Sequence, residues 1–171
     1  MRTTALRRQV TVASPPALTP GWGHGVSQVR RLRGSGGYLE LTAFEWGSAA
    51  RRAIGAAFRQ LADARAIILD LRQHRGGEES MASYITSCFF TTEPMGRERF
   101  APSPLPPGPV PASGAPRLLS APIDILISHE TSAVGLAFAA NLEHFGRARI
   151  VGPAPRRWLS SLSPRMPSPS R

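Results

Sequence analysis

The 171-residue chain contains no lysine, because all 21 of its basic residues are arginine. It has a single cysteine, Cys88, which excludes an internal disulfide and a thiolate metal site. We expect Cys88 to lie in a helix and to pack against neighbouring apolar groups. No apolar run approaches the roughly 18 residues that a membrane-spanning helix needs, and no signal-peptide segment is recognisable. The absence of lysine also removes that residue as a general base. We therefore expect a soluble protein without a transmembrane segment, cytoplasmic by default.

Acidic residues are few, and all eleven lie between Glu40 and Glu143. Eleven arginines between Gly34 and Gly152 balance them, so the net charge of +10 comes from six arginines before Gly34 and four after Gly152. Basic tails can bind phosphate, but these tails lack interleaved aromatic residues and any recognisable binding module. The distribution of charge therefore predicts no nucleic-acid partner.

The length and the 42% content of hydrophobic residues suit one core and one domain. Residues 1–33 have no sustained periodicity and are interpreted as a weakly structured basic leader. Residues 37–44 alternate like a half-buried strand, with Leu39 and Leu41 inward, and Ser48 is placed to cap the helix that follows. In that helix an apolar stripe is expected inside and an arginine face in solvent; the stripe is Ile54, Phe58 and Leu61, and the face is Arg51, Arg52 and Arg59.

Strand and helix patterns then alternate along the chain, which predicts an α/β layer of parallel strands joined by right-handed crossovers. The expected elements are a strand at 66–71 covered on both faces, a helix from 78 to about 90, a strand at 123–127, a helix at 133–145 and a strand at 148–151. Residues 101–116 are too rich in proline for a strand and are expected to form a loop.

Gly76 and Gly77 stand between an expected strand and an expected helix. Their N–H groups can point into a cleft at the positive end of the helix and stabilise an oxyanion, or the pair can be a plain tight turn with positive φ. No spacing of histidine, cysteine or carboxylate residues suits a metal, and the glycine run at 34–37 precedes a strand, so it is no dinucleotide loop. We expect no metal and no cofactor.

Three blocks of sequence carry a family resemblance. They are GYLELTAF, ARAIILDLRQHRGGEESMASYITSCFF and PIDILISHETSAVGLAFAANLEHFGRARIVG, which together cover roughly residues 37–152. In order and spacing they resemble the tail-specific protease family, also called C-terminal processing peptidases, and most closely the branch whose domain recurs in interphotoreceptor retinoid-binding protein. The resemblance implies a crotonase/Clp protease-like layered sheet at residues 34–152, serine-peptidase ancestry, and an oxyanion hole at Gly76, Gly77 and Val134.

The nucleophile of the resembled family has no counterpart in this chain. In the matching register Thr131 and Phe138 fit the family's pattern, but Ala133 stands at the position of the nucleophile and Ser132 at an aromatic position. Leu136 and Ala137 replace an acidic pair, and the family's downstream Gly-Glu-Thr becomes Gly-Pro-Ala at 152–154. Ser132 is either a substitute nucleophile or a helix N-cap.

Histidines are the bases that remain. His24 and His129 are the candidate general bases for Ser132, and His74 lies beside the double glycine; each is otherwise a surface or turn residue.

Two hypotheses about function follow from the sequence. One is a serine-type peptidase domain that is degenerate or truncated, a pseudoenzyme; the other is a non-catalytic relative that binds a peptide or an apolar ligand.

The family usually has a helical region before the first block and more sheet after the third, so the resemblance implies an incomplete sheet. The segment 153–171 has no acidic residue and no apolar periodicity, which predicts a disordered basic tail rich in proline and serine. Such a tail also suits a shifted reading frame in a gene rich in G and C. A polypeptide is the expected partner, and the oligomeric state is left open.

Overall fold

The computed structural model of the chain describes residues 22–90 and 120–153. The loop expected at 101–116, and all but the first residue of the tail expected at 153–171, lie outside the described residues. No described helix is long and apolar enough to cross a membrane.

The described residues build one five-stranded mixed sheet, which confirms the α/β prediction. Its strands lie in chain order, with the first pair antiparallel and the other pairs parallel. The strands are β1 (Val26–Leu32), β2 (Gly36–Leu41), β3 (Ala66–Asp70), β4 (Ile123–Leu126) and β5 (Ala148–Val151).

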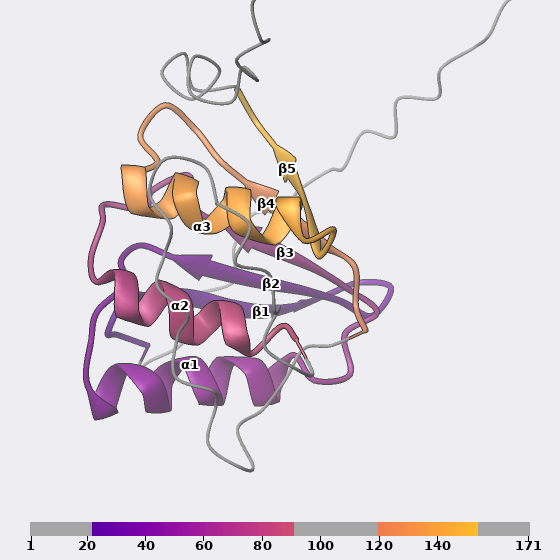
Figure 1. Cartoon of the computed structure of the whole chain (residues 1–171). Coiled ribbons are helices and arrows are strands. Elements are labelled where there is room, and N and C mark those ends of the chain that lie inside the picture. The colour runs from indigo at the N-terminus through magenta and orange to yellow at the C-terminus, as the bar shows by residue number, and fades with distance from the viewer. Residues whose placement is uncertain (1–21, 91–119, 154–171) are drawn as a thin grey trace, which may run out of the picture.

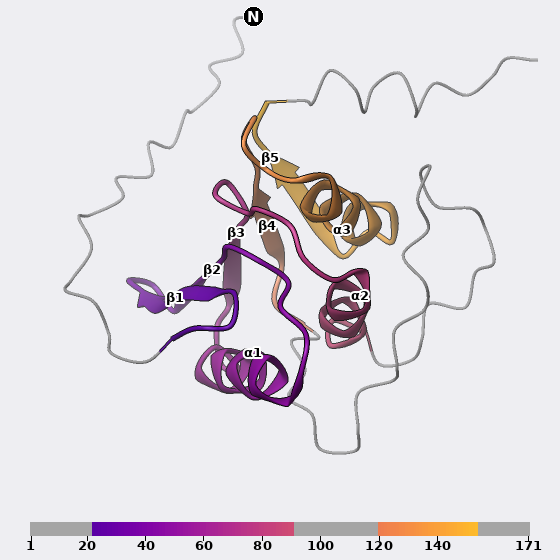
Figure 2. The same cartoon turned by 90° about the vertical axis from the view of Figure 1, so that its left-hand side faces the viewer.

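Three described helices follow the parallel strands: α1 (Ser48–Gln60), α2 (Glu79–Ser87) and α3 (Ala133–His144). Because crossovers between parallel strands are right-handed and the strand order never reverses, all three helices fall on the same side of the sheet. Figures 1 and 2 show this arrangement, with one face of the sheet covered by α1, α2 and α3.

The core fills the space between the sheet and the helices. Strand register places Leu39 of β2 opposite Leu69 of β3, and Leu69 opposite Ile125 of β4, so these side chains form one buried row. The expected inward positions Leu39 and Leu41 are both buried, as predicted. Phe58 of α1 closes this core from the helical side, together with the other two residues of the predicted stripe, Ile54 and Leu61.

The first strand corrects the prediction of weak structure for residues 26–32 of the expected leader. Val26 and Val29 of β1 are both buried although they are three residues apart, a spacing that a regular strand cannot place on one face. The register shifts between Val26 and Gln28, so an extra residue at this bulge brings both valines to the core. The bulge therefore hides the alternation by which a strand is recognised in a sequence.

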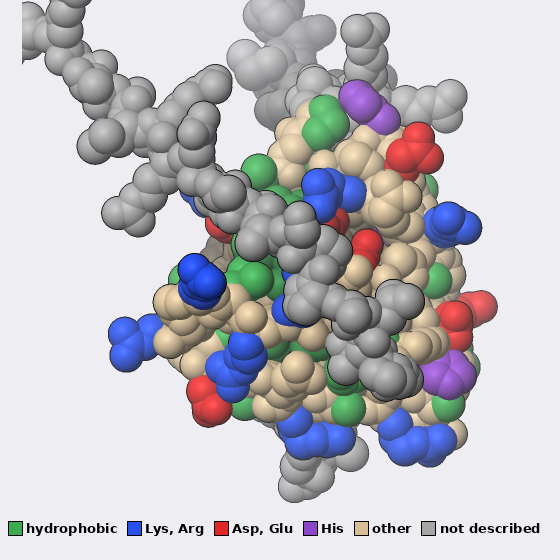
Figure 3. Space-filling model, turned by 180° about the vertical axis from the view of Figure 1, so that it is seen from behind, with side chains coloured by type: hydrophobic (Ala, Val, Ile, Leu, Met, Phe, Trp, Pro, Cys, Tyr) green, Lys and Arg blue, Asp and Glu red, His purple; other side chains and the backbone are tan. Residues whose placement is uncertain are grey.

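Two further expectations are wrong. Helix α1 has Gly47, not Ser48, at its N-cap, and no side chain caps it. Among the described residues, helices cover only one side of strand β3, whose residues alternate between the core and a face without described helices, on which Ile68 is half-buried. The visible part of this face mixes hydrophobic, basic and acidic side chains (Figure 3).

Candidate functional site

The carboxyl ends of β2, β3 and β4 meet at one edge of the sheet, where ligand sites of parallel sheets form. The segments that follow these strands are joined by backbone hydrogen bonds. The Arg75 N–H donates to the Thr42 carbonyl at 2.8 Å, the Phe44 N–H donates to the Gly76 carbonyl at 2.8 Å, and the Glu78 N–H donates to the Phe44 carbonyl at 2.7 Å. The turn after β3 is therefore fixed against the turn after β2.

The double glycine adopts a backbone that other residues rarely adopt. Gly76 and Gly77 have φ angles of 128° and 124°. A Cβ atom at Gly77 would lie 2.3 Å from the Phe44 carbonyl oxygen, whereas one at Gly76 would meet open space. Gly77 thus allows the close approach of two backbones. Binding of an oxyanion by the N–H groups of Gly76 and Gly77 stays a prediction.

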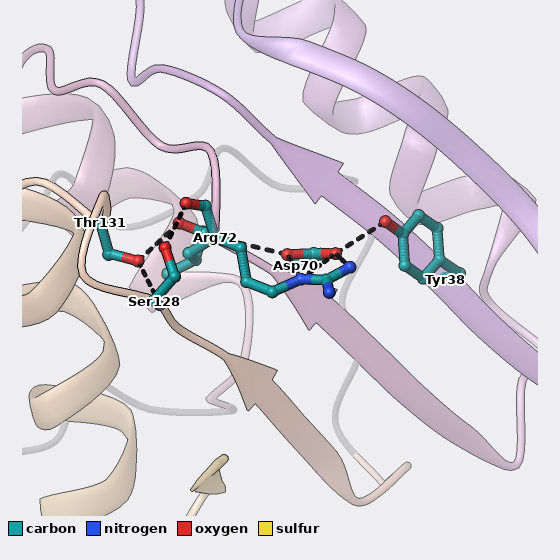
Figure 4. A network of polar contacts seen from close by, with 6 residues as sticks. Tyr38, Asp70, Arg72, Ser128 and Thr131 are labelled. Carbon is teal, nitrogen blue, oxygen red and sulfur yellow. Dashed lines mark hydrogen bonds and ion pairs between the residues drawn. The ribbon is translucent and has the colours of Figure 1, made fainter. Parts of the chain in front are cut away.

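Hydroxyl groups join the β3 and β4 turns (Figure 4). The Thr131 Oγ1 donates to the Leu71 carbonyl at 2.8 Å and accepts from the Ser128 N–H at 2.9 Å. The Ser128 hydroxyl donates to the Arg72 carbonyl at 2.6 Å. These contacts hold the segment that leads into α3 against the residues that follow β3.

A buried carboxylate anchors the end of β3 on the helix-free face (Figure 4). Asp70 is 2% exposed and accepts hydrogen bonds from the Tyr38 hydroxyl at 2.8 Å and from the Arg72 guanidinium at 2.7 Å. Burial works to raise the pKa of Asp70, but the hydrogen bonds from Arg72 and Tyr38 outweigh it and hold the pKa below its ordinary value. Burial, helped by the Asp70 carboxylate, raises the pKa of Tyr38 to about 12. Asp70 therefore stays ionised and paired.

Ser132 is the N-cap of α3, which confirms the capping interpretation of its position. Its Oγ accepts from the Gly135 N–H at 3.3 Å, the bond that satisfies one of the free donors of a helix start. The same Oγ lies 2.8 Å from Nδ1 of His74, and the Ser132 N–H donates to the His74 carbonyl at 2.9 Å. Ser132 therefore both caps α3 and forms a serine–histidine pair with His74.

His74 is fully buried in the described structure. Its ring centroid lies 4.2 Å from that of Phe44, and a Cβ atom at Gly135 would lie only 2.8 Å from its Nδ1, so glycine at 135 makes room for the imidazole. Its other nitrogen, Nε2, has no hydrogen-bond partner among the described residues. Burial lowers the pKa of His74 to about 4, so the ring is neutral at pH 7.

The contact between His74 and Ser132 does not follow from the sequence pattern, which predicts a turn or surface residue at His74. The signal that could have found it is topological. His74 follows β3 and Ser132 follows β4, and the carboxyl ends of adjacent parallel strands lie at the same edge of a sheet.

The remaining predicted site residues are not brought to Ser132 by any described contact. Ala133 is exposed as the first residue of α3, and Val134 behind it is half-buried. His24 is exposed and its Nδ1 lies 3.2 Å from Oε2 of Glu45, while His129 is exposed. The roles assigned to Val134, His24 and His129 stay predictions. In the described ranges no group of three or more histidine, cysteine or carboxylate side chains could hold a metal ion.

The described residues thus form an α/β domain with a mixed sheet, a double-glycine turn and a serine at the start of a helix, both at the carboxyl edge of the parallel strands. The particular family is shown by its model, peptidase family S41, which matches residues 35–158. The chain belongs to this family, the one that contains the tail-specific proteases it resembles in sequence. The branch that includes the retinoid-binding protein stays a prediction.

Solved structures share the fold. A Bacteroides fragilis protein assigned to the S41 proteases has 21% identity and a TM-score of 0.57, over 75% of this chain and 38% of its own. A protein of Parabacteroides merdae assigned to the peptidases has 17% identity and a TM-score of 0.54, over 74% of this chain and 42% of its own. A lipoprotein of Streptococcus agalactiae has 15% identity and a TM-score of 0.50, over 72% and 47%.

This chain thus spans less than half of each of these structures. No curated protein matches it.

Proposed function

We propose that this chain is a degenerate S41 domain that binds a polypeptide at the carboxyl edge of its sheet without cleaving it. The observation that carries the proposal is the start of α3. Ala133, at the position that the family resemblance gives to the nucleophile, is exposed and has no group that can attack a carbonyl. The adjacent hydroxyl, that of Ser132, accepts the capping hydrogen bond from the Gly135 N–H.

The surroundings of Ser132 also argue against its use as a nucleophile. General-base catalysis is most efficient when the pKa of the base lies near the working pH, and the pKa of His74 is about 4. Proton transfer from Ser132 would create a buried imidazolium whose Nε2 has no partner among the described residues. The pair is therefore better suited to fixing α3 against the turn after β3 than to activating a serine.

The second candidate is a working serine peptidase in which Ser132 attacks and His74 is the base. The 2.8 Å contact between Oγ and Nδ1 favours it, because this distance lies within the range for proton transfer. In that mechanism the N–H groups of Gly76, Gly77 and Val134 hold the oxyanion. It requires that a bound substrate raise the pKa of His74 toward neutrality.

One experiment separates the two candidates. The full chain is incubated with a fluorescein-labelled unstructured peptide; fluorescence anisotropy reports binding and mass spectrometry reports cleavage. We expect binding without cleavage. Cleavage that is lost in both Ser132→Ala and His74→Asn would establish the second candidate instead, and absence of binding would contradict the first.

Ala133→Ser is the matched variant, because it restores a hydroxyl at the exposed position with the addition of one oxygen. Without a positioned base it should still lack useful turnover, since general-base assistance contributes typically about 100-fold to 10,000-fold. Robust cleavage by Ala133→Ser would show that a base is already in place, with His74, His24 and His129 the first residues to replace.

A further inference from the structure

One arginine beside the candidate site has its guanidinium within cation–π distance of two aromatic rings. The guanidinium carbon of Arg51, in α1, lies 4.4 Å from the ring centroid of Trp46 and 4.8 Å from that of Tyr84 in α2. Trp46 is 48% exposed, whereas Tyr84 is buried. The sequence predicts Arg51 on a solvated face with Arg52 and Arg59, but Arg51 is half-buried and only the other two are exposed.

Arg51 has no counter-charge in the described structure. No described carboxylate pairs with it, and the first turn of α1, where it lies, contains no acidic residue. The nearby Glu45 carboxylate contacts His24 instead. A cation at a helix N-terminus opposes the helix dipole, so the position of Arg51 is held by its aromatic contacts and not by charge.

A guanidinium donates its hydrogen bonds in its own plane, and no described carboxylate pairs with Arg51, so these donors suit a planar carboxylate. The exposed part of Trp46, nearly half of the residue, is available for an apolar group. The Arg51 guanidinium and the Trp46 indole therefore offer a polar contact and an apolar contact next to each other.

The cluster of Trp46, Arg51 and Tyr84 lies at the same edge of the sheet as the candidate site. Trp46 is two residues after Phe44, which pairs with Gly77, and Tyr84 belongs to the helix that begins directly after the double glycine. Glu78 and Glu79 are exposed at this turn. Their negative charges repel a polyphosphate, which carries several charges, more strongly than a single carboxylate, so of these two ligands a carboxylate-bearing polypeptide is the better fit.

We propose that Trp46 and Arg51 form a recognition site for a carboxylate on the bound polypeptide, with an adjacent apolar side chain of that polypeptide on the exposed face of Trp46. This proposal rests on the polypeptide-binding function above and adds a specificity to it. The carboxylate is an aspartate or glutamate side chain or the terminus of the bound chain, and the probes below distinguish these sources.

The test measures anisotropy with the full chain and four fluorescein-labelled hexapeptides that share one phenylalanine. The first has glutamate after phenylalanine and an amidated end, and the second has glutamine in that place. The third is the glutamine peptide with a free C-terminal carboxylate, and the fourth is the glutamate peptide with alanine in place of phenylalanine. Charge-assisted hydrogen bonds of this kind change affinity by about tenfold or more.

We expect the wild-type chain to bind the glutamate peptide or the free-carboxylate peptide about tenfold more tightly than the amidated glutamine peptide. Arg51→Gln should abolish that difference, and Trp46→Ala should abolish the preference for phenylalanine. Arg52→Gln is the matched control: it removes the same charge from the neighbouring exposed position and should leave the preference intact. Arg51→Lys, which keeps the charge but not the planar fork, should retain only part of it.

An equal loss of the carboxylate preference in Arg51→Gln and Arg52→Gln would overturn the proposal, since only the overall positive charge would then matter. So would equal binding of all four peptides, which would leave the polypeptide-binding function standing and remove its specificity. Absence of all peptide binding would overturn both. Thermal unfolding of each variant serves as the fold control, and Trp46→Phe, which retains an aromatic ring, replaces Trp46→Ala if that variant unfolds.

Discussion

Acidification should destabilise this protein through one buried side chain, His74. The pKa of His74 falls from its ordinary value of 6.5 to about 4 in the folded state because the ring is buried. Between these two values the unfolded chain binds a proton that the folded chain excludes, so stability is complete above about pH 6.5 and falls as the pH drops toward 4. Each pKa unit corresponds to about 1.4 kcal/mol, so the loss amounts to about 3 kcal/mol.

The assay is urea unfolding of the wild type and of His74→Asn at several pH values between 7.5 and 4. The asparagine amide can replace Nδ1 as a partner of Ser132 and does not titrate in this range. His74→Asn should be less stable at pH 7.5, since it loses the ring contact with Phe44. The gap between the two proteins should shrink by about 3 kcal/mol on acidification. The carboxylates, Asp70 among them, and the exposed histidines are the same in both proteins, so their contributions to the pH dependence cancel in the gap. A gap that stays constant with pH would refute the buried, neutral state of His74.

Other perturbations test the remaining contacts. Gly135→Ala should destabilise the fold by about 1–3 kcal/mol in urea unfolding, because its Cβ would collide with the His74 ring; unchanged stability would show that the ring can move aside. Tyr38→Phe removes the hydrogen bond to a buried carboxylate and should cost about 1.5–3 kcal/mol, and no loss would mean that water replaces the hydroxyl. A chain reduced to residues 34–152 loses β1 with its two buried valines, each worth about 1.5–3 kcal/mol, so its thermal midpoint should fall well below that of a chain that begins at residue 22. Equal midpoints would mean that β1 adds nothing to the core.

Most of the sheet could be predicted from the sequence because its core strands follow simple patterns. The alternation in β2 and the short apolar runs of β3 and β4 each place one face against the helices, and a one-residue shift would have exposed every core side chain. Helix α3 ends at His144, next to the predicted end, because Gly146, with φ of 65°, can leave the helical conformation there.

The candidate site was less predictable because its contacts join residues far apart in the chain. His74 and Ser132 are 58 positions apart, and neither position alone distinguishes a buried partner from a turn histidine. The place of Arg51 on its helix predicts exposure to solvent, since the periodicity of one helix gives no sign of the contact with the Trp46 ring. Such contacts depend on how loops of different strands meet.

The most direct test of the proposed loss of catalysis is intact-mass spectrometry of the full chain after exposure to a fluorophosphonate, which labels activated serines. The account predicts no adduct, because Ala133 carries no nucleophile and Ser132 caps α3 beside a weakly basic histidine. A stoichiometric adduct that is lost in Ser132→Ala and retained in Ser128→Ala would contradict the account and make Ser132 the nucleophile of an active peptidase.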